Sequence, residues 1–245
     1  MKGQFLNKAF HTLTEAFQNC LKRFPTTVCF VLALTAYLAY LVSTEMDDEK
    51  KLTLVLGYYF SVGTLLSLTL HLWSEEIKNR IKEISVHIVM HVLLIADAVY
   101  LYSLSPERSL TEISIAHGAA ILALWLSVFF LSFTQEKNDI PSWNFASYTV
   151  GAFVTANVVG LIMSGGISLL VFSLHQLFDV DVSWKCYLYI LVVCSVLLPM
   201  LLFLGMLPKN KLKHNQEPQP SEFLNGTIHF LFLPLMAGYL LVLYI

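Results

Sequence analysis

Long runs without Asp, Glu, Lys or Arg constrain this chain more than any other feature. Five such runs, each 21 to 23 residues long, cover residues 24–44, 52–74, 113–135, 186–208 and 223–245. A helix needs about 20 predominantly apolar residues to cross the ~30 Å hydrocarbon core of a bilayer. The sequence therefore predicts an all-α, polytopic integral membrane bundle.

The composition supports this fold class, and it excludes an ordinary soluble domain and a nucleic-acid-binding protein. Hydrophobic residues make up 56% of the chain and charged residues only 13%, whereas about a quarter of an ordinary soluble domain is charged. The 15 basic and 17 acidic residues nearly balance, so no basic excess is available to neutralise nucleic-acid phosphates. We expect the lipid bilayer, and no nucleic acid, as a partner.

Two further segments complete the set of spans. Residues 84–104 contain a single charge, Asp97, and residues 140–178 are charge-free over 39 residues. The second segment is too long for one straight crossing, so we interpret it as one helix over 146–177 that is tilted or kinked. Ser164, Gly165 and Gly166 are the expected kink, because glycine pairs weaken the helical ladder locally. Two half-spans broken at these glycines are the alternative.

Seven transmembrane helices follow from these segments. Their expected bounds are 24–43, 52–73, 84–104, 113–133, 146–177, 185–207 and 223–245. With the N-terminus inside, eleven of the 15 basic residues fall on the cytoplasmic side, and Lys50, Lys51, Arg108 and Lys185 fall outside. Because cytoplasmic loops carry the excess of Lys and Arg, we expect a cytoplasmic N-terminus and an outside C-terminus.

Residues 1–23 precede the transmembrane domain of residues 24–245. Their apolar side chains recur at helical spacing while the lysines lie off that stripe, which is typical of an amphipathic helix lying in the membrane interface. A cleavable signal peptide is the competing interpretation. It is disfavoured because the apolar run that follows is longer than the usual 7 to 15 residues.

Asp97 is the only formal charge inside a span. At ~1.5 Å per residue, Asp97 lies ~10 Å and His117 ~6 Å below the outer surface on consecutive helices. We therefore predict that Asp97 pairs with His117, with His175 as a third candidate, in a protonatable outer cluster. The alternative is that Asp97 is protonated or bonded to a neighbouring hydroxyl or carbonyl group and serves packing only.

Four other histidines lie in the cytoplasmic half of the bundle. His87 and His91 are four residues apart on one helical face, and His71 and His229 are expected at a similar depth. Such nitrogens could ligate zinc or haem. Since no HExxH motif accompanies them, interhelical hydrogen bonds and a proton relay are the other interpretations, and no cofactor is predicted.

Two helix faces are expected to point into the bundle. Ala152, Ala156, Gly160 and Ser164 form a small-residue stripe on which a neighbouring helix can approach closely. Residues 57–71 carry small and hydroxyl side chains along one face, ending at His71. Both features fit packing, although transporters also bind substrate beside interrupted, glycine-containing helices.

Three segments carry a resemblance to a known family. They are KRFPTTVCFVLALT near the start, residues 164–208 with the glycine pair and the sequence KCYLY, and FLNGTIHFLFLPLMAGYLLVLYI at the end. In these the chain resembles the bacterial inner-membrane family called domain of unknown function 4153. The resemblance implies a bacterial inner-membrane location, and it implies no catalytic residues. Family members are usually longer, so the chain resembles their N-terminal portion.

The residues leave three hypotheses for function. The first is a transport-like or permeation-like module for a small solute or a proton, which uses the Asp97 cluster. The second is a scaffold or signalling module that assembles partners, including copies of itself. The third is a haem- or metal-binding redox protein. No nucleophile and base arrangement or phosphate-binding glycine loop is present, so nothing favours an enzyme.

Overall fold

The structure is a computed structural model that describes residues 20–44, 50–76, 80–104, 110–134, 138–178, 181–208 and Lys213. Within these ranges every regular element is a helix, which confirms the all-α fold class. The expected interfacial helix, apart from residues 20–23, and the expected seventh span 223–245 lie outside the described residues.

The described elements follow the chain in a simple order. They are α2 (Pro25–Ser43), α3 (Lys50–Ser74), α4 (Arg80–Ser103), α5 (Leu110–Phe130), η1 (Leu131–Phe133), α6 (Ile140–Phe178), α7 (Trp184–Val192), η2 (Val193–Leu197) and α8 (Leu198–Met206). Here η1 is a 3₁₀ turn, and η2 is a π-helical turn that joins α7 and α8 into one rod. Six segments of this part are long and apolar enough to cross a membrane, and they coincide with six of the seven predicted spans.

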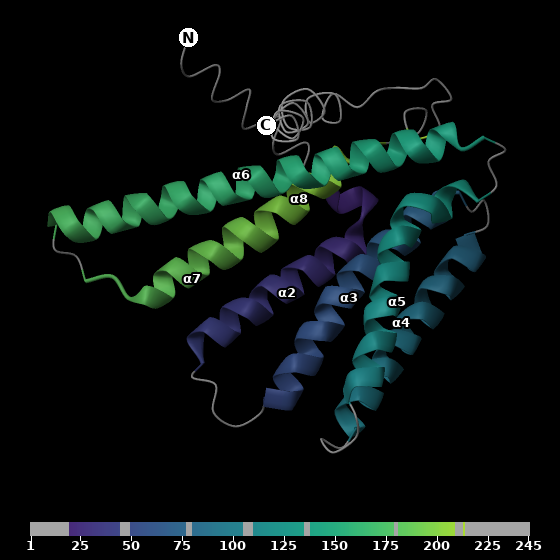
Figure 1. Cartoon of the computed structure of the whole chain (residues 1–245), viewed down its shortest axis with the longest axis horizontal. Coiled ribbons are helices and arrows are strands. Elements are labelled where there is room, and N and C mark those ends of the chain that lie inside the picture. Colours follow the sequence, from purple (N-terminus) through teal and green to yellow (C-terminus); the bar gives the residue numbers. More distant parts are fainter. Residues whose placement is uncertain are drawn as a thin grey trace, which may run out of the picture.

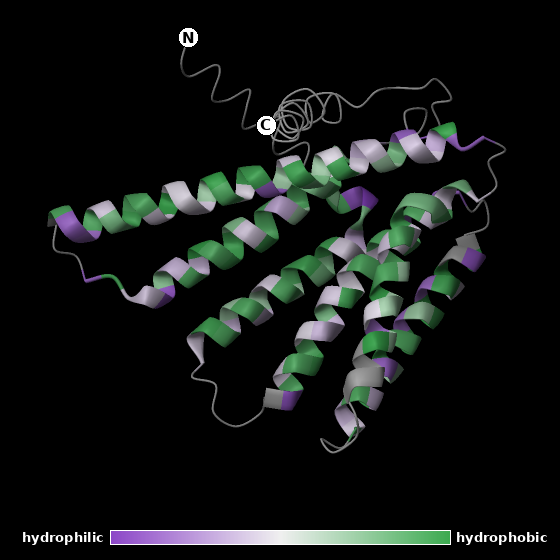
Figure 2. Cartoon of the chain, in the orientation of Figure 1, coloured by the Kyte–Doolittle hydropathy of each residue, from purple (hydrophilic) through white to green (hydrophobic). Residues whose placement is uncertain are grey.

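α3 lies at the centre of the helix arrangement. It packs against α2, α4 and α5, while α6 packs against α5, α7 and α8. In Figure 1 the helices splay apart from one end, and α6 runs obliquely across that end. Figure 2 shows apolar residues along the helices and the strongly hydrophilic ones mainly near helix ends. Such a distribution is required where only hydrocarbon surrounds the middle of a helix.

Polar contacts show which helix ends lie together at the same end of the bundle. At one end, Arg23 before α2 bonds Glu75 after α3 and the carbonyl group that follows Met206 of α8. At the other end, Lys185 at the start of α7 donates to the carbonyl oxygen of Ser43 at the end of α2, 3.2 Å away. Because α4 and α5 run back and forth between these ends, the start and the end of α6 lie at opposite ends of the bundle.

α6 is not interrupted at the position where the sequence predicts a kink. The helix runs unbroken through Ser164, Gly165 and Gly166 for 39 residues, a length of ~58 Å, and Figure 1 draws it without a sharp bend. Among the described residues, no atom outside the glycines' own stretch of helix lies within 4 Å of a Cβ built on either glycine. Glycine pairs weaken the helical ladder, but no described neighbour packs against the glycines here to bend it.

α6 also begins six residues earlier than the sequence predicts. Asn138 Oδ1 accepts a hydrogen bond from the backbone N–H of Ile140 at 3.2 Å, and Pro141 occupies the first turn. Both residue types favour a helix start, the first by capping a free N–H group and the second because it has none to satisfy.

The small-residue stripe of α6 packs as expected. Ala152 and Ala156 are buried, and a Cβ built on Gly160 would lie 2.5 Å from both the carbonyl oxygen of Cys194 and the Cγ of Pro199. Pro199 has no N–H to offer the preceding turn and its ring crowds that turn, which accounts for the π-helical turn η2 just before it. Gly160 lets the backbones of α6 and η2 meet at this point.

We expect Gly160→Ala to destabilise the fold by about 1–3 kcal/mol, because the added methyl group overpacks a contact between two backbones. Gly166→Ala is the matched control on the same helix. Its methyl group meets no atom, so the better helix propensity of alanine should leave stability unchanged or raise it by up to about 1 kcal/mol. Denaturant unfolding of the purified protein in detergent measures both, and equal losses would contradict the close approach at Gly160.

Candidate functional site

Asp97 holds the centre of a polar cluster between three helices. His117 Nε2 on α5 lies 3.1 Å from Asp97 Oδ1 on α4, and the Tyr58 hydroxyl on α3 donates to Asp97 Oδ2 at 2.7 Å. The structure therefore contains the contact between Asp97 and His117 that the depth of the two residues predicts. We call Tyr58, Asp97 and His117 the Asp97 cluster.

Sequence reasoning missed Tyr58 as a partner of Asp97. The same depth argument would have found it, because Tyr58 lies six residues into a span that starts outside. At ~1.5 Å per residue it is ~9 Å deep, close to Asp97. An aromatic residue at that depth can place its hydroxyl group on a carboxylate of the next helix.

His175 does not join the Asp97 cluster. It lies in the last turn of α6, and in Figure 1 this end of α6 points away from α4 and α5. The expectation rested only on the place of His175 near the outer end of the long helix. Because α6 is unbroken and packs there on α7, it carries His175 to the other side of the molecule.

The Asp97 cluster borders a hollow of about 310 Å³ between α3, α4 and α5. Tyr58 and Asp97 line it, together with apolar side chains such as Leu94 and Leu124. Asp97 and His117 are both partly exposed. Asp97 Oδ2 accepts from the Tyr58 phenol and Oδ1 lies at hydrogen-bond distance from the His117 imidazole, so both carboxylate oxygens contact side chains of other helices.

His71, His87 and His91 form a row of rings toward the opposite end of α3 and α4. The ring centroids of His71 and His87 are 4.9 Å apart, and those of His87 and His91 6.2 Å apart. His71 Nε2 bonds the Thr26 hydroxyl at 2.8 Å. His91 Nδ1 donates to the carbonyl oxygen of His87 at 2.7 Å. The row therefore connects α2, α3 and α4.

His91 forms a hydrogen bond between α3 and α4. Because its Nδ1 donates to a carbonyl oxygen, its Nε2 in the neutral ring accepts the hydrogen bond from the Ser67 hydroxyl at 3.0 Å. Interhelical hydrogen bonding, one of the predicted interpretations, is present here. Among the described residues no three His, Cys, Asp or Glu side chains form a group that could hold a metal ion, and His229 lies outside them.

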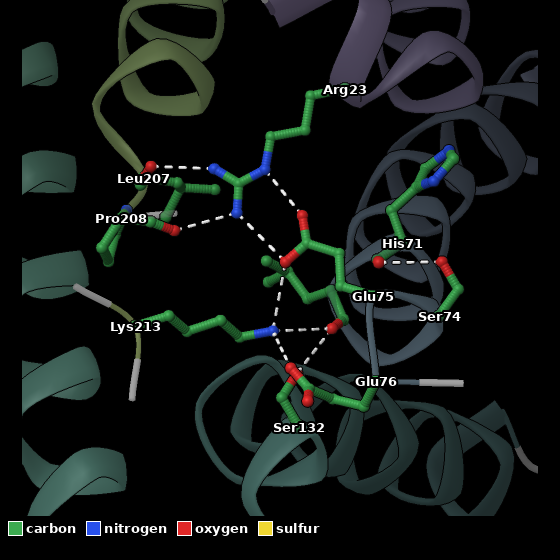
Figure 3. A network of polar contacts seen from close by, with 10 residues as sticks. Arg23, His71, Ser74, Glu75, Glu76, Ser132, Leu207, Pro208 and Lys213 are labelled. Atoms are coloured by element: carbon green, nitrogen blue, oxygen red, sulfur yellow. Dashed lines mark hydrogen bonds and ion pairs between the residues drawn. The ribbon is translucent and has the colours of Figure 1, made fainter. Parts of the chain in front are cut away.

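A third polar group joins the helix ends on the side of Arg23 (Figure 3). The Arg23 guanidinium donates to Glu75 Oε1 at 2.7 Å and Oε2 at 3.2 Å. It also donates to the carbonyl oxygens of Leu207 at 2.8 Å and Pro208 at 2.9 Å. One side chain thereby ties the start of α2 to the ends of α3 and α8.

Lys213 completes this group, which we call the hub: Arg23, Glu75, Glu76 and Lys213. Its side chain is 1% exposed. Its Nζ donates to the carbonyl oxygen of Leu72 at 2.9 Å, Glu75 Oε2 at 3.1 Å and Glu76 Oε1 at 2.8 Å, as Figure 3 shows. An ammonium group this deeply buried requires such acceptors, since a buried charge without partners is very costly.

The hub also sets the ionisation of Glu75. Burial alone would raise the pKa of its carboxyl group, but the hydrogen bond from Arg23 and the charges of Arg23 and Lys213 outweigh burial and lower that pKa below its usual range. Glu75 is thus held as a carboxylate beside two cations.

No sequence pattern indicated the hub. Arg23 and Lys213 entered the sequence analysis only among the eleven basic residues expected on the cytoplasmic side. Their partner Glu75 is 52 residues from Arg23 and 138 from Lys213 along the chain. No local spacing rule connects residues so far apart, and only the packing of α2, α3 and α8 brings them together.

No family model, curated protein or solved structure matches this chain.

Acid should destabilise the protein through Glu75. A carboxyl group with a depressed pKa in the folded state contributes stability above its unfolded pKa of ~4.3 and loses it as the pH falls through the folded value. Glu75→Gln should lower stability at pH 7 by about 1.5–3 kcal/mol, the worth of hydrogen bonds to charged groups, and flatten the acid dependence. Unfolding midpoints between pH 7 and pH 3 measure this.

Asp181→Asn is the control for this prediction, because Asp181 is exposed and outside the hub. It should leave the pH profile of stability unchanged. Identical acid profiles for wild type and Glu75→Gln would show that Glu75 is not held as a carboxylate by the hub.

Proposed function

We propose that this chain is a proton-coupled transport or permeation module, in which Asp97 takes up and releases the proton. The observation that carries the proposal is the bonding of both Asp97 oxygens, one to an imidazole and one to a phenol, on two different helices. Ionisable residues inside a membrane are costly and mark ion pathways and proton relays in many transporters.

The coupling follows from the charge of the pair. With Asp97 ionised and His117 protonated, the two charges attract across α4 and α5, and the Tyr58 phenol adds a bond from α3. A proton taken up by Asp97 removes the negative charge and with it the attraction. The contacts beside the 310 Å³ hollow then weaken, so protonation and the opening between these helices are linked.

The location and topology belong to the same proposal. The distribution of Lys and Arg supports seven spans with a cytoplasmic N-terminus, and the family resemblance supports a bacterial inner membrane. In that orientation the Asp97 cluster faces the outside and the hub lies at the cytoplasmic surface. Protons would enter from the outer side.

A scaffold without substrate is the second candidate, and one observation favours it. α4 exposes apolar side chains along most of its length, including Ile88, Val92, Ile95 and Val99. Such a surface suits lipid, but it also suits another helix or a second copy of the chain. In this case the Asp97 cluster only ties α3, α4 and α5 together.

Asp97→Asn should reduce proton flux into vesicles at least tenfold, because an amide keeps the shape of the carboxyl group but carries no titratable proton. His117→Gln should have a similar effect, and Tyr58→Phe a smaller one, since the phenol only supports the carboxylate. The measurement is the quenching of a pH-sensitive dye inside proteoliposomes under an imposed pH gradient. Asp181→Asn should match the wild type.

The scaffold candidate predicts a different pattern. The wild-type protein would then conduct no protons above empty vesicles, and Asp97→Asn would change only the unfolding midpoint. Wild-type flux that survives Asp97→Asn in a folded protein would contradict the role of Asp97.

A further inference from the structure

The hollow beside Asp97 has a polar end and an otherwise apolar wall. It measures about 310 Å³ and lies between α3, α4 and α5, which is within the ~300–1,000 Å³ of small-molecule sites. Asp97 and Tyr58 supply its polar groups. The other residues that line it in the described part of the chain are alanine, valine, leucine, isoleucine and methionine. A molecule in the hollow therefore meets one carboxylate and a large apolar surface.

The apolar wall extends along the helices away from the carboxylate. On α4, Leu94 and Met90 precede Asp97 by three and seven residues, and both line the hollow. On α3, Leu66 lies eight residues beyond Tyr58 and lines it too. Seven residues of helix span ~10 Å, so a ligand with its polar head at Asp97 has about that length of apolar wall for its body.

The Asp97 carboxylate is within reach of such a ligand. Its side chain is 36% exposed even though both oxygens already have partners. An ionised carboxyl group offers about four acceptor sites, so each oxygen can accept a second donor or contact a cation. Tyr58, which also lines the hollow, adds an aromatic ring of the kind that attracts organic cations.

The hollow is accessible from the side of the bundle. Leu93 on α4 and Ile121 on α5 both line it, and they are 56% and 36% exposed. The opening therefore lies between two helices that are apolar enough to span a membrane. An amphipathic molecule that partitions into a bilayer can enter there.

The charge of the Asp97 cluster determines which ligand suits the hollow. Among the described residues, the titratable groups that contact Asp97 are His117 from α5 and Tyr58 from α3. With Asp97 ionised and the other two groups neutral, the cluster carries one negative charge. A proton on the pair of Asp97 and His117 removes that charge, and a cation in the hollow balances it. Proton and cation therefore compete for the same carboxylate.

We propose that the hollow binds a small amphipathic organic cation, with its ammonium head at Asp97, and exchanges it for one proton. This inference rests on the proposed function, because it names the substrate of the same site. As the cation enters, one proton leaves the pair of Asp97 and His117 for the solvent, so the net charge of the site is unchanged. An anion is excluded by the carboxylate. Ca²⁺ takes about six to eight oxygen ligands, which this apolar wall does not supply.

Calorimetric titration of the purified full chain in detergent tests this proposal. The probe is benzyltrimethylammonium, a permanent cation with an apolar ring. Phenylacetate and N,N-dimethylbenzamide are an anion and a neutral molecule of similar size, and we expect binding of the cation alone. Titrations in buffers of different ionisation enthalpy count the protons released. We expect one proton per bound cation where the pair is protonated, and there an affinity that falls about tenfold per pH unit, because the coupling is reciprocal.

Two variants sharpen the test. Asp97→Asn should weaken binding of benzyltrimethylammonium about ten- to a hundredfold, the effect of one contact with a charged group, and abolish the proton release. Ala120→Leu leaves the Asp97 cluster in place but fills part of the hollow, which Ala120 lines, and it should weaken binding about fivefold or more through overpacking. Ala119→Leu is its matched control, because Ala119 is exposed and does not line the hollow, and it should bind like the wild type.

Three results would overturn the proposal. The first is a wild-type protein that does not bind the cation. The second is equal binding of the cation and the neutral amide, and the third is equal binding of the cation by the wild type and by folded Asp97→Asn. Proton flux into vesicles is measured separately. Flux without cation binding would overturn only the cation as substrate, whereas cation binding with proton release but no flux would contradict transport and support the cation site.

Discussion

The pairing of Arg23 and Lys213 with Glu75 is the interaction on which the arrangement of the helices depends. Apolar helices in lipid gain little specificity from hydrophobicity, because the surrounding chains are as apolar as their own side chains. Directional contacts must then fix which ends meet. At the hub, a carboxylate and two cations join the start of α2 with the ends of α3 and α8, and the rest of the bundle splays from this point.

α3 and the residue that follows it contribute to all three polar groups. Glu75 belongs to the hub, His71 belongs to the histidine row and Ser67 bonds it, and Tyr58 donates to Asp97. Successive polar contacts therefore connect α3 to α2 and α4 at one end and to α4 and α5 at the other. In the proposed transport function, α3 is the element that stays in place while α4 and α5 move as Asp97 changes its charge.

The sequence predicted features that are set within single helices, and it missed contacts that only the packing of several helices creates. Charge-free runs located five of the six spans, and the sixth was found as an apolar run with Asp97 as its single charge. Depth along the helices brought Asp97 to His117. α6 is one continuous helix through the glycine pair, because two glycines permit a bend without causing one. His175 was placed by its depth alone, and α6 carries it away from α4 and α5. The hub was missed because only tertiary structure brings Arg23 and Lys213 to Glu75. The N-terminal helix and the seventh span stay predictions.

Infrared spectroscopy can follow the protonation of the Asp97 carboxyl group itself. Difference spectra between wild type and Asp97→Asn isolate its signal, and a change from H₂O to D₂O reports exchange with the bulk solvent. If Asp97 carries the transported proton, its carboxyl or carboxylate band depends on external pH and responds to D₂O as soon as the solvent is exchanged. A band that ignores both pH and D₂O while the protein stays folded would show that Asp97 is sealed, and it would contradict proton transfer through this residue.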